Sequence, residues 1–91
     1  MTNKRIKELN SLRDKSKARR EAGQFIVEGL KMFVEAPESD VVETYVTKEF
    51  EAAHKDVLKG KKYEVIDSSL MSKLSDTKTP QGVLCVLFKI A

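Results

Sequence analysis

The sequence predicts an α/β fold, in which one three-layer α/β/α domain contains a mostly parallel sheet of four strands. Short apolar runs alternate with helical patterns along the whole chain, which is typical of this fold class. Glycine, proline or a polar turn separates each run from the next. With 91 residues, of which 41% are hydrophobic, the chain has enough apolar surface for one modest core.

Residues 3–22 predict two basic helices. In the first, Ile6, Leu9 and Leu12 recur at three-residue spacing and form one narrow apolar edge. The second ends at Gly23, which suits a left-handed C-cap, and it is polar nearly all round. Such a helix is either a solvated surface helix or one that faces phosphate. We favour the second interpretation because its cations are not balanced by acids.

Residues 24–88 predict an α/β body. The most apolar run, Val83–Phe88, is the best candidate for the central strand. Pro37 restricts the residue before it, so the helix that follows Gly29 should end at Ala36. The remaining strands are expected at Gln24–Glu28, Val42–Thr47 and Tyr63–Ile66, and the remaining helices at Lys48–Leu58 and Ser69–Leu74.

Positive charge gathers in the first third of the chain. Residues 1–31 hold nine Lys or Arg against four Asp or Glu, a net charge of +5, whereas the other sixty residues carry −2. A basic face on a neutral-to-acidic body attracts polyanions. Composition alone does not separate a nucleic-acid-binding face from an ordinary solvated surface.

No residue type in this sequence predicts catalysis or metal binding. Cys85 lies in an apolar run without a neighbouring His or acid, so we expect a buried structural thiol. One cysteine and one histidine, His54, do not make a zinc site, and no glycine-rich nucleotide-binding motif occurs. The single cysteine, with no membrane-spanning or signal-peptide run, favours a cytoplasmic protein without membrane association.

Two motifs lie far apart in the chain. Gly23–Gly29 reads Gly-Gln-Phe-Ile-Val-Glu-Gly and follows the basic stretch Lys15–Arg20. Leu74–Val83 reads Leu-Ser-Asp-Thr-Lys-Thr-Pro-Gln-Gly-Val. In this order and separation they resemble the N-terminal substrate-binding domain of the SpoU-type, TrmH-like RNA 2′-O-ribose methyltransferases of the SPOUT superfamily. The resemblance covers nearly the whole chain, although Pro37 interrupts a helix that is usually longer in the family.

The resemblance implies a fold like that of the kink-turn-binding ribosomal proteins and a role in binding structured RNA. The expected partner is 23S-type large-subunit rRNA, with tRNA as the alternative. In the family, S-adenosylmethionine and the catalytic Asn and Arg motifs belong to a C-terminal knotted domain that this sequence lacks. We therefore expect no catalysis, cofactor or metal in residues 1–91, and a homodimer formed through the missing domain. The chain stops directly after its predicted central strand, which suggests a domain cut from a longer protein.

The candidate RNA-binding residues form two groups. The cationic group would contact phosphates with an affinity that falls as salt rises, and the loop group would contact a folded or unpaired RNA element. Whether the two loops share a face depends on the fold, and Gly29 could serve only as a turn residue. The alternatives are a free-standing ribosomal-type RNA-binding domain and a protein-interaction module that dimerises through a sheet edge. The cationic group is Arg13, Lys15, Lys17, Arg19 and Arg20, and the loop group is Gly29, Lys31, Thr77, Lys78, Thr79 and Gln81.

Overall fold

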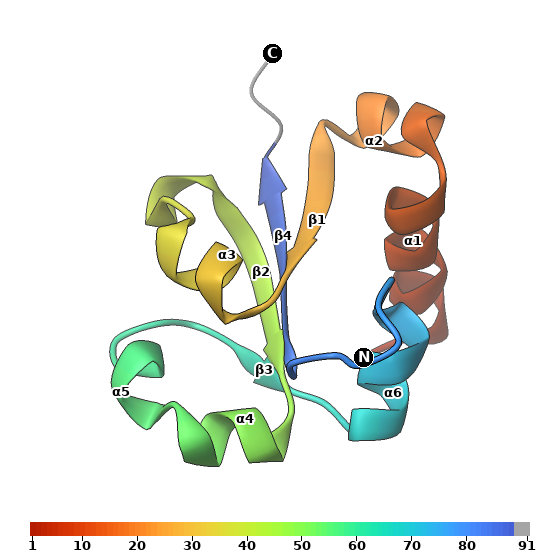
Figure 1. Cartoon of the computed structure of the whole chain (residues 1–91). Coiled ribbons are helices and arrows are strands. Elements are labelled where there is room, and N and C mark those ends of the chain that lie inside the picture. Colours follow the sequence, from red (N-terminus) through yellow and green to blue (C-terminus); the bar gives the residue numbers. More distant parts are fainter. Residues whose placement is uncertain (89–91) are drawn as a thin grey trace.

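The computed structural model describes residues 1–88, which form a four-stranded mixed sheet with helices on both of its faces (Figure 1). The α/β class and the four predicted strands are therefore confirmed. The elements are α1 (Asn3–Asp14), α2 (Ser16–Ala22), β1 (Gln24–Glu28), α3 (Leu30–Glu35), the 3-10 turn η1 (Glu38–Asp40), β2 (Val41–Val46), α4 (Lys48–Ala53), α5 (Lys55–Leu58), β3 (Glu64–Val65), α6 (Ser68–Leu74) and β4 (Val83–Phe88).

The strands lie in the order β1-β4-β2-β3, and the prediction of a mostly parallel sheet was wrong. β4 runs antiparallel to both β1 and β2, and only β2 and β3 are parallel. After α6, the loop 75–82 leads the chain into β4 at the end of the sheet where β1 and β2 finish. Val83 accordingly pairs with Val46, and Leu84 with Glu28. An alternation of strands and helices does not reveal this, because the connecting segment is long enough for either strand direction.

β4 is an inner strand of the sheet, between β1 and β2, as its apolar sequence predicted, and it packs against helices on both faces. Leu84 and Val86 belong to the core cluster under α1 and α6. Val83, Cys85 and Leu87 belong to the core cluster under α3, α4 and α5. Because successive side chains of a strand point to opposite faces, one continuous apolar run supplies both halves of the core.

The helices complete the two halves of the core with a few large side chains each. The apolar edge predicted for α1 is confirmed, since Leu9 and Leu12 are buried. Thr2 caps this helix by accepting a hydrogen bond from the backbone N–H of Arg5 at 3.1 Å. The further buried helical residues are Met71 and Leu74 on the α1 side, and Phe33, Phe50 and Leu58 on the opposite side.

Two elements differ in extent from the prediction. The helix expected from Lys48 to Leu58 is broken at His54, whose backbone (φ −131°, ψ 40°) is not helical. The third strand pairs through only two residues, Glu64–Val65. In α3, Phe33 is buried while the neighbouring Val34 is 57% exposed. No helix within residues 1–88 is long and apolar enough to span a bilayer.

Replacing Leu84 by alanine should lower the free energy of unfolding by about 2–5 kcal/mol, because the change removes buried methyl groups and leaves a cavity in the central strand. Leu84 is 0% exposed. Urea denaturation followed by circular dichroism measures the effect. Val34→Ala, at an exposed position of α3, is the matched control, and its free energy of unfolding should change by no more than about 0.5 kcal/mol. Similar small losses for both variants would contradict the central position of β4.

Candidate nucleic-acid interface

The two sequence motifs meet at one end of the sheet, where β1 and β2 finish and β4 begins. The backbone N–H of Gly29 donates to the carbonyl of Val83 at 3.2 Å, and that of Thr47 donates to Gly82 at 2.9 Å. The loop after β1 and the loop before β4 therefore lie side by side. The antiparallel direction of β4 produces this arrangement, since a parallel strand would begin at the other end of the sheet.

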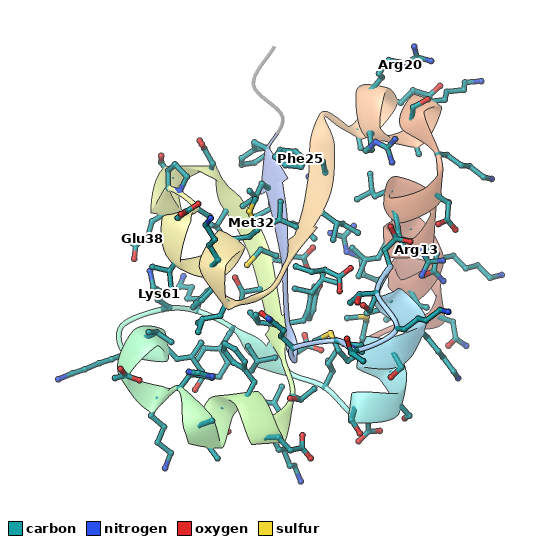
Figure 2. The ribbon with its side chains drawn as sticks, in the orientation of Figure 1. Arg13, Arg20, Phe25, Met32, Glu38 and Lys61 are labelled. Atoms are coloured by element: carbon teal, nitrogen blue, oxygen red, sulfur yellow. The ribbon has the colours of Figure 1, made fainter. Side chains whose placement is uncertain are left out.

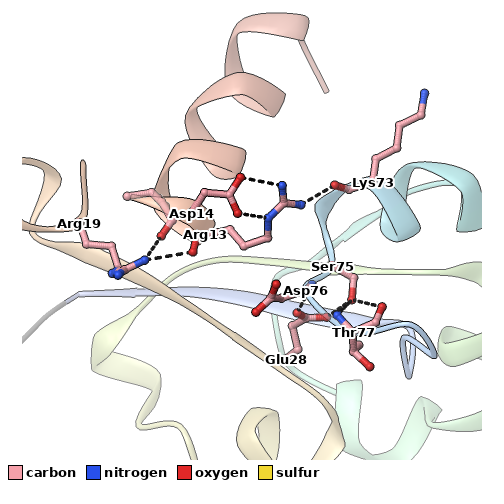
Figure 3. A network of polar contacts seen from close by, with 9 residues as sticks. Arg13, Asp14, Arg19, Glu28, Lys73, Ser75, Asp76 and Thr77 are labelled. Atoms are coloured by element: carbon pink, nitrogen blue, oxygen red, sulfur yellow. Dashed lines mark hydrogen bonds and ion pairs between the residues drawn. The ribbon is translucent and has the colours of Figure 1, made fainter. Parts of the chain in front are cut away.

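Glu28, the last residue of β1, ties the second loop to the first. One carboxylate oxygen accepts from the hydroxyl of Ser75 at 2.5 Å, and the other accepts from the backbone N–H of Asp76 at 2.8 Å (Figure 3). The Ser75 oxygen also accepts from the N–H of Thr77 at 3.1 Å. Both oxygens of Glu28 are thus occupied in holding the loop. Glu28 was not among the candidate residues chosen from the sequence, so this positioning role was missed.

Gln81 makes a second link between the loops. Its side-chain oxygen accepts from the backbone N–H of Leu30 at 2.8 Å, which satisfies one of the free N–H groups at the start of α3. The side-chain amide NH₂ remains available as a donor. The backbone of Gly29 lies close to the Gln81 side chain, since a Cβ at this position would be 2.9 Å from the Gln81 oxygen. The φ of Gly29, +95°, also favours glycine.

The linked loops enclose a surface pocket that contains most of the loop group. Lys78 is exposed but does not line it. The pocket combines two carboxylates, one ammonium group, two hydroxyls and one amide, so it offers both donors and acceptors to a polar ligand. Its lining residues are Glu28, Gly29, Lys31, Asp76, Thr77, Thr79 and Gln81.

Arg13, from the cationic group, is held within the domain. Its Nε and Nη2 atoms donate to the Asp14 carboxylate at 2.7 and 2.9 Å, and Nη1 donates to the carbonyl of Lys73 at 2.7 Å (Figure 3). These bonds raise the pKa of Arg13 and lower the pKa of Asp14. Arg13 thereby joins the end of α1 to the last turn of α6.

Arg19 is also used inside the domain. Its Nη1 atom donates to the carbonyls of Leu12 and Arg13, at 2.8 and 3.0 Å, which are among the unpaired carbonyls at the C-terminus of α1 (Figure 3). The helical conformation is interrupted between α1 and α2 at Lys15, whose backbone is extended. Arg19 therefore fixes the corner between α1 and α2. Sequence spacing did not indicate this capping role.

The other three members of the cationic group are exposed. Lys17 lies 3.8 Å from Glu21, a surface pair that contributes little to stability. Figure 2 shows the Arg20 side chain extending from α2 away from the sheet. α2 buries no residue and ends at Gly23, whose φ of +65° confirms the predicted left-handed cap. Lys15, Lys17 and Arg20 thus remain accessible to a polyanion.

A groove along β1 adjoins the loop pocket. Arg13 and Arg19 line it, together with the apolar side chain of Phe25 and the carboxyl-bearing residues Glu28 and Asp76. Glu28 and Asp76 also line the loop pocket. Two members of the cationic group therefore lie next to the loop pocket, whereas the exposed Lys15, Lys17 and Arg20 are not part of the lining of this groove.

The thiol of Cys85 is not part of this surface. It is buried in β4 and lies 3.6 Å from the hydroxyl of Thr44. Burial raises the pKa of the Cys85 thiol, so the reactive thiolate form is disfavoured. Within residues 1–88, no three His, Cys, Asp or Glu side chains lie close enough together to hold a metal ion.

Comparison with known proteins identifies related sequences and folds. The sequence model of a family described as the MRM3-like substrate binding domain matches residues 3–85. No curated protein matches the chain at a significant level.

Solved structures share the fold at low sequence identity. The SpoU methyltransferase AviRb from Streptomyces viridochromogenes, in complex with AdoMet, is 22% identical with a TM-score of 0.73, over 99% of this chain and 37% of its own. An AdoMet-bound rRNA methyltransferase from Sinorhizobium meliloti is 21% identical with a TM-score of 0.70, over 99% and 35%. A putative TrmH-family RNA methyltransferase from Porphyromonas gingivalis gives 22% and 0.70, over 100% and 36%. The chain thus spans about a third of each of these proteins.

Gly82→Ala should destabilise the protein more than Gly60→Ala. Both glycines have positive φ, which costs alanine about 1–2 kcal/mol. A Cβ at Gly60 would meet no atom within 4 Å, whereas one at Gly82 would lie 2.7 Å from Thr47 Oγ1 and 3.1 Å from Phe50 Cβ. We expect an additional loss of about 1–3 kcal/mol at Gly82 in urea denaturation. Equal losses would show that Gly82 is not tightly packed.

Glu28→Ala should loosen the second loop without unfolding the sheet. Alanine removes both oxygens that accept from the Ser75 hydroxyl and the Asp76 N–H, and each lost bond to a charged group costs about 1.5–3 kcal/mol. Hydrogen exchange of the Asp76 and Thr77 amides should accelerate. Glu35→Ala is the control, because this exposed carboxylate makes no hydrogen bond within residues 1–88. Unchanged hydrogen exchange at the Asp76 amide would contradict the role of Glu28 in holding this loop.

Proposed function

Because the chain belongs to the MRM3-like substrate binding domain family, we propose that it recognises structured RNA for a SpoU-type RNA 2′-O-ribose methyltransferase. One observation carries the proposal. The two motifs that resemble this family, far apart in sequence, are joined in one pocket that adjoins a cationic surface. A surface of this kind supplies phosphate attraction and polar base contacts next to each other.

The proposed substrate is rRNA, and within it 23S-type large-subunit rRNA. Two of the similar structures are of AdoMet-bound or AdoMet-complexed methyltransferases, and one of these is described as an rRNA methyltransferase. Since this chain matches about a third of each, we assign S-adenosylmethionine binding, methyl transfer and dimerisation to another domain of the parent protein. The role of residues 1–91 is then to bind the RNA and orient it. A cytoplasmic location fits this role.

The candidate RNA-binding residues have different proposed roles, according to the hydrogen bonds that each already makes within the domain. The exposed cations Lys15, Lys17 and Arg20 contact phosphates and supply salt-dependent affinity. Arg13 and Arg19 hold the C-terminal end of α1, next to these cations, and both residues line the groove along β1. The loop residues that contact an unpaired or folded RNA element are Gly29, Lys31, Thr77, Lys78, Thr79 and Gln81.

The experiment that tests this function is a titration of the 91-residue chain with structured rRNA fragments and with a DNA duplex of matched length, at low and moderate salt. A preference for one RNA fragment that persists at moderate salt supports recognition by this domain. Equal binding of RNA and DNA that disappears with salt contradicts it, because a general anion-binding surface behaves in that way.

The double variant Lys17→Glu/Arg20→Glu should weaken binding of structured rRNA by about tenfold at low salt. It should also reduce the slope of log affinity against log salt by about two, since each lost phosphate contact removes about one. Fluorescence anisotropy measures both quantities. Lys55→Glu/Lys59→Glu is the control, because these exposed lysines lie on and after α5, on the other side of the sheet (Figure 1). An equal effect of both double variants would contradict the assignment of phosphate contacts to α2.

A further inference from the structure

We infer that the pocket between the two motif loops binds one unpaired guanine base, which the Asp76 carboxylate recognises. This inference rests on the proposed function, because it takes RNA as the ligand. It goes further by naming the base and the side chain that selects it.

The charge of the pocket opposes a phosphate ligand. Two carboxylates, Glu28 and Asp76, face one ammonium group, that of Lys31. Arg13 lies nearby, but its guanidinium is paired with the Asp14 carboxylate. A phosphate would meet like charge here, whereas a group that presents N–H donors would be attracted. The loop pocket thus suits a base edge, and the exposed cations of α2 suit the phosphates.

The hydrogen bonds inside the domain determine which polar atoms remain available. Both oxygens of Glu28 accept from the loop, so they are not free for a ligand. No group within residues 1–88 donates to the Asp76 carboxylate, which leaves two free acceptor oxygens side by side. Gln81 uses its oxygen at Leu30, so its amide is free only as a donor. Lys31 adds a further donor.

Guanine fits this set of atoms better than the other bases. On its Watson–Crick edge, N1–H and the N2 amino group are two adjacent donors, and O6 beside them is an acceptor. A carboxylate can accept from both donors, while an amide or ammonium group donates to O6. Adenine and cytosine present one donor group next to an acceptor, and uracil presents one donor between two acceptors. Because duplex pairing occupies this edge, the guanine must be unpaired.

The pocket is organised before any ligand binds. The backbone N–H of Asp76 is fixed by Glu28, and Ser75 binds the N–H of Thr77. Pro80 further limits the conformations of this loop. Because the backbone that carries Asp76 is already held, binding of a base costs less backbone ordering, and only the exposed side chain has to become ordered.

The test uses short unstructured uridine oligonucleotides that differ only at one central nucleotide. This nucleotide is guanosine, inosine, adenosine or 2′-deoxyguanosine, and inosine lacks only the N2 amino group of guanosine. The chain should bind the guanosine probe about tenfold more tightly than the inosine or adenosine probe. The 2′-deoxyguanosine probe should bind like the guanosine probe, because the base and not the ribose is recognised.

Asp76→Asn should abolish this preference. The substitution replaces one acceptor oxygen by an NH₂ group and preserves the size of the side chain, whose carboxylate makes no hydrogen bond within the described part of the chain. The variant should therefore fold normally, which circular dichroism checks. Asp56→Asn is the matched control, since this exposed aspartate lies on α5, outside the loop pocket. It should retain the full preference for guanosine.

The outcomes separate the two proposals. Structured rRNA that binds while the guanosine, inosine and adenosine probes bind equally, or not at all, overturns the guanine pocket and leaves the proposed function standing. A preference that survives Asp76→Asn, or one that 2′-deoxyguanosine loses and inosine keeps, also overturns it. Failure of the chain to bind any RNA, structured or not, overturns both proposals.

Discussion

The antiparallel position of β4 between β1 and β2 is the constraint on which the rest of the structure depends. It brings the loop that precedes β4 to the sheet end where β1 stops, within reach of Glu28 and Leu30. The alternating side chains of β4 also supply both halves of the core. One strand therefore determines the packing of the domain and the formation of the loop pocket.

The polar residues of the candidate interface divide into those that build the surface and those that remain available on it. Glu28 and Gln81 use their acceptor oxygens within the domain, and Arg13 and Arg19 close helix ends. These bonds restrict the side chains and the backbone around them. The groups left over, among them the Asp76 carboxylate, are consequently attached to backbone that hydrogen bonds hold. Preorganisation of this kind favours selective binding over indiscriminate attraction.

Local features of the fold were predictable from the sequence, and non-local ones were not. The bounds of β1 and β4, the C-cap at Gly23 and the end of α3 at Ala36 follow from hydrophobic runs, glycine and proline. The direction of β4 depends on where a long loop crosses the sheet, which local patterns do not encode. Motif and charge likewise led to the two candidate residue groups, whose contact with RNA stays a prediction. The capping role of Arg19 depends on where the carbonyls of α1 end in space.

β4 follows both of its partner strands along the chain, and this order has a consequence for biosynthesis. β1 obtains its hydrogen-bonded partner only when β4 is present, whereas β2 can pair with β3 earlier. During translation, β1 therefore leaves the ribosome without the strand that joins it to β2. Completion of the sheet waits for residues 83–88, so the nascent domain depends on rapid late closure or on chaperones to avoid aggregation.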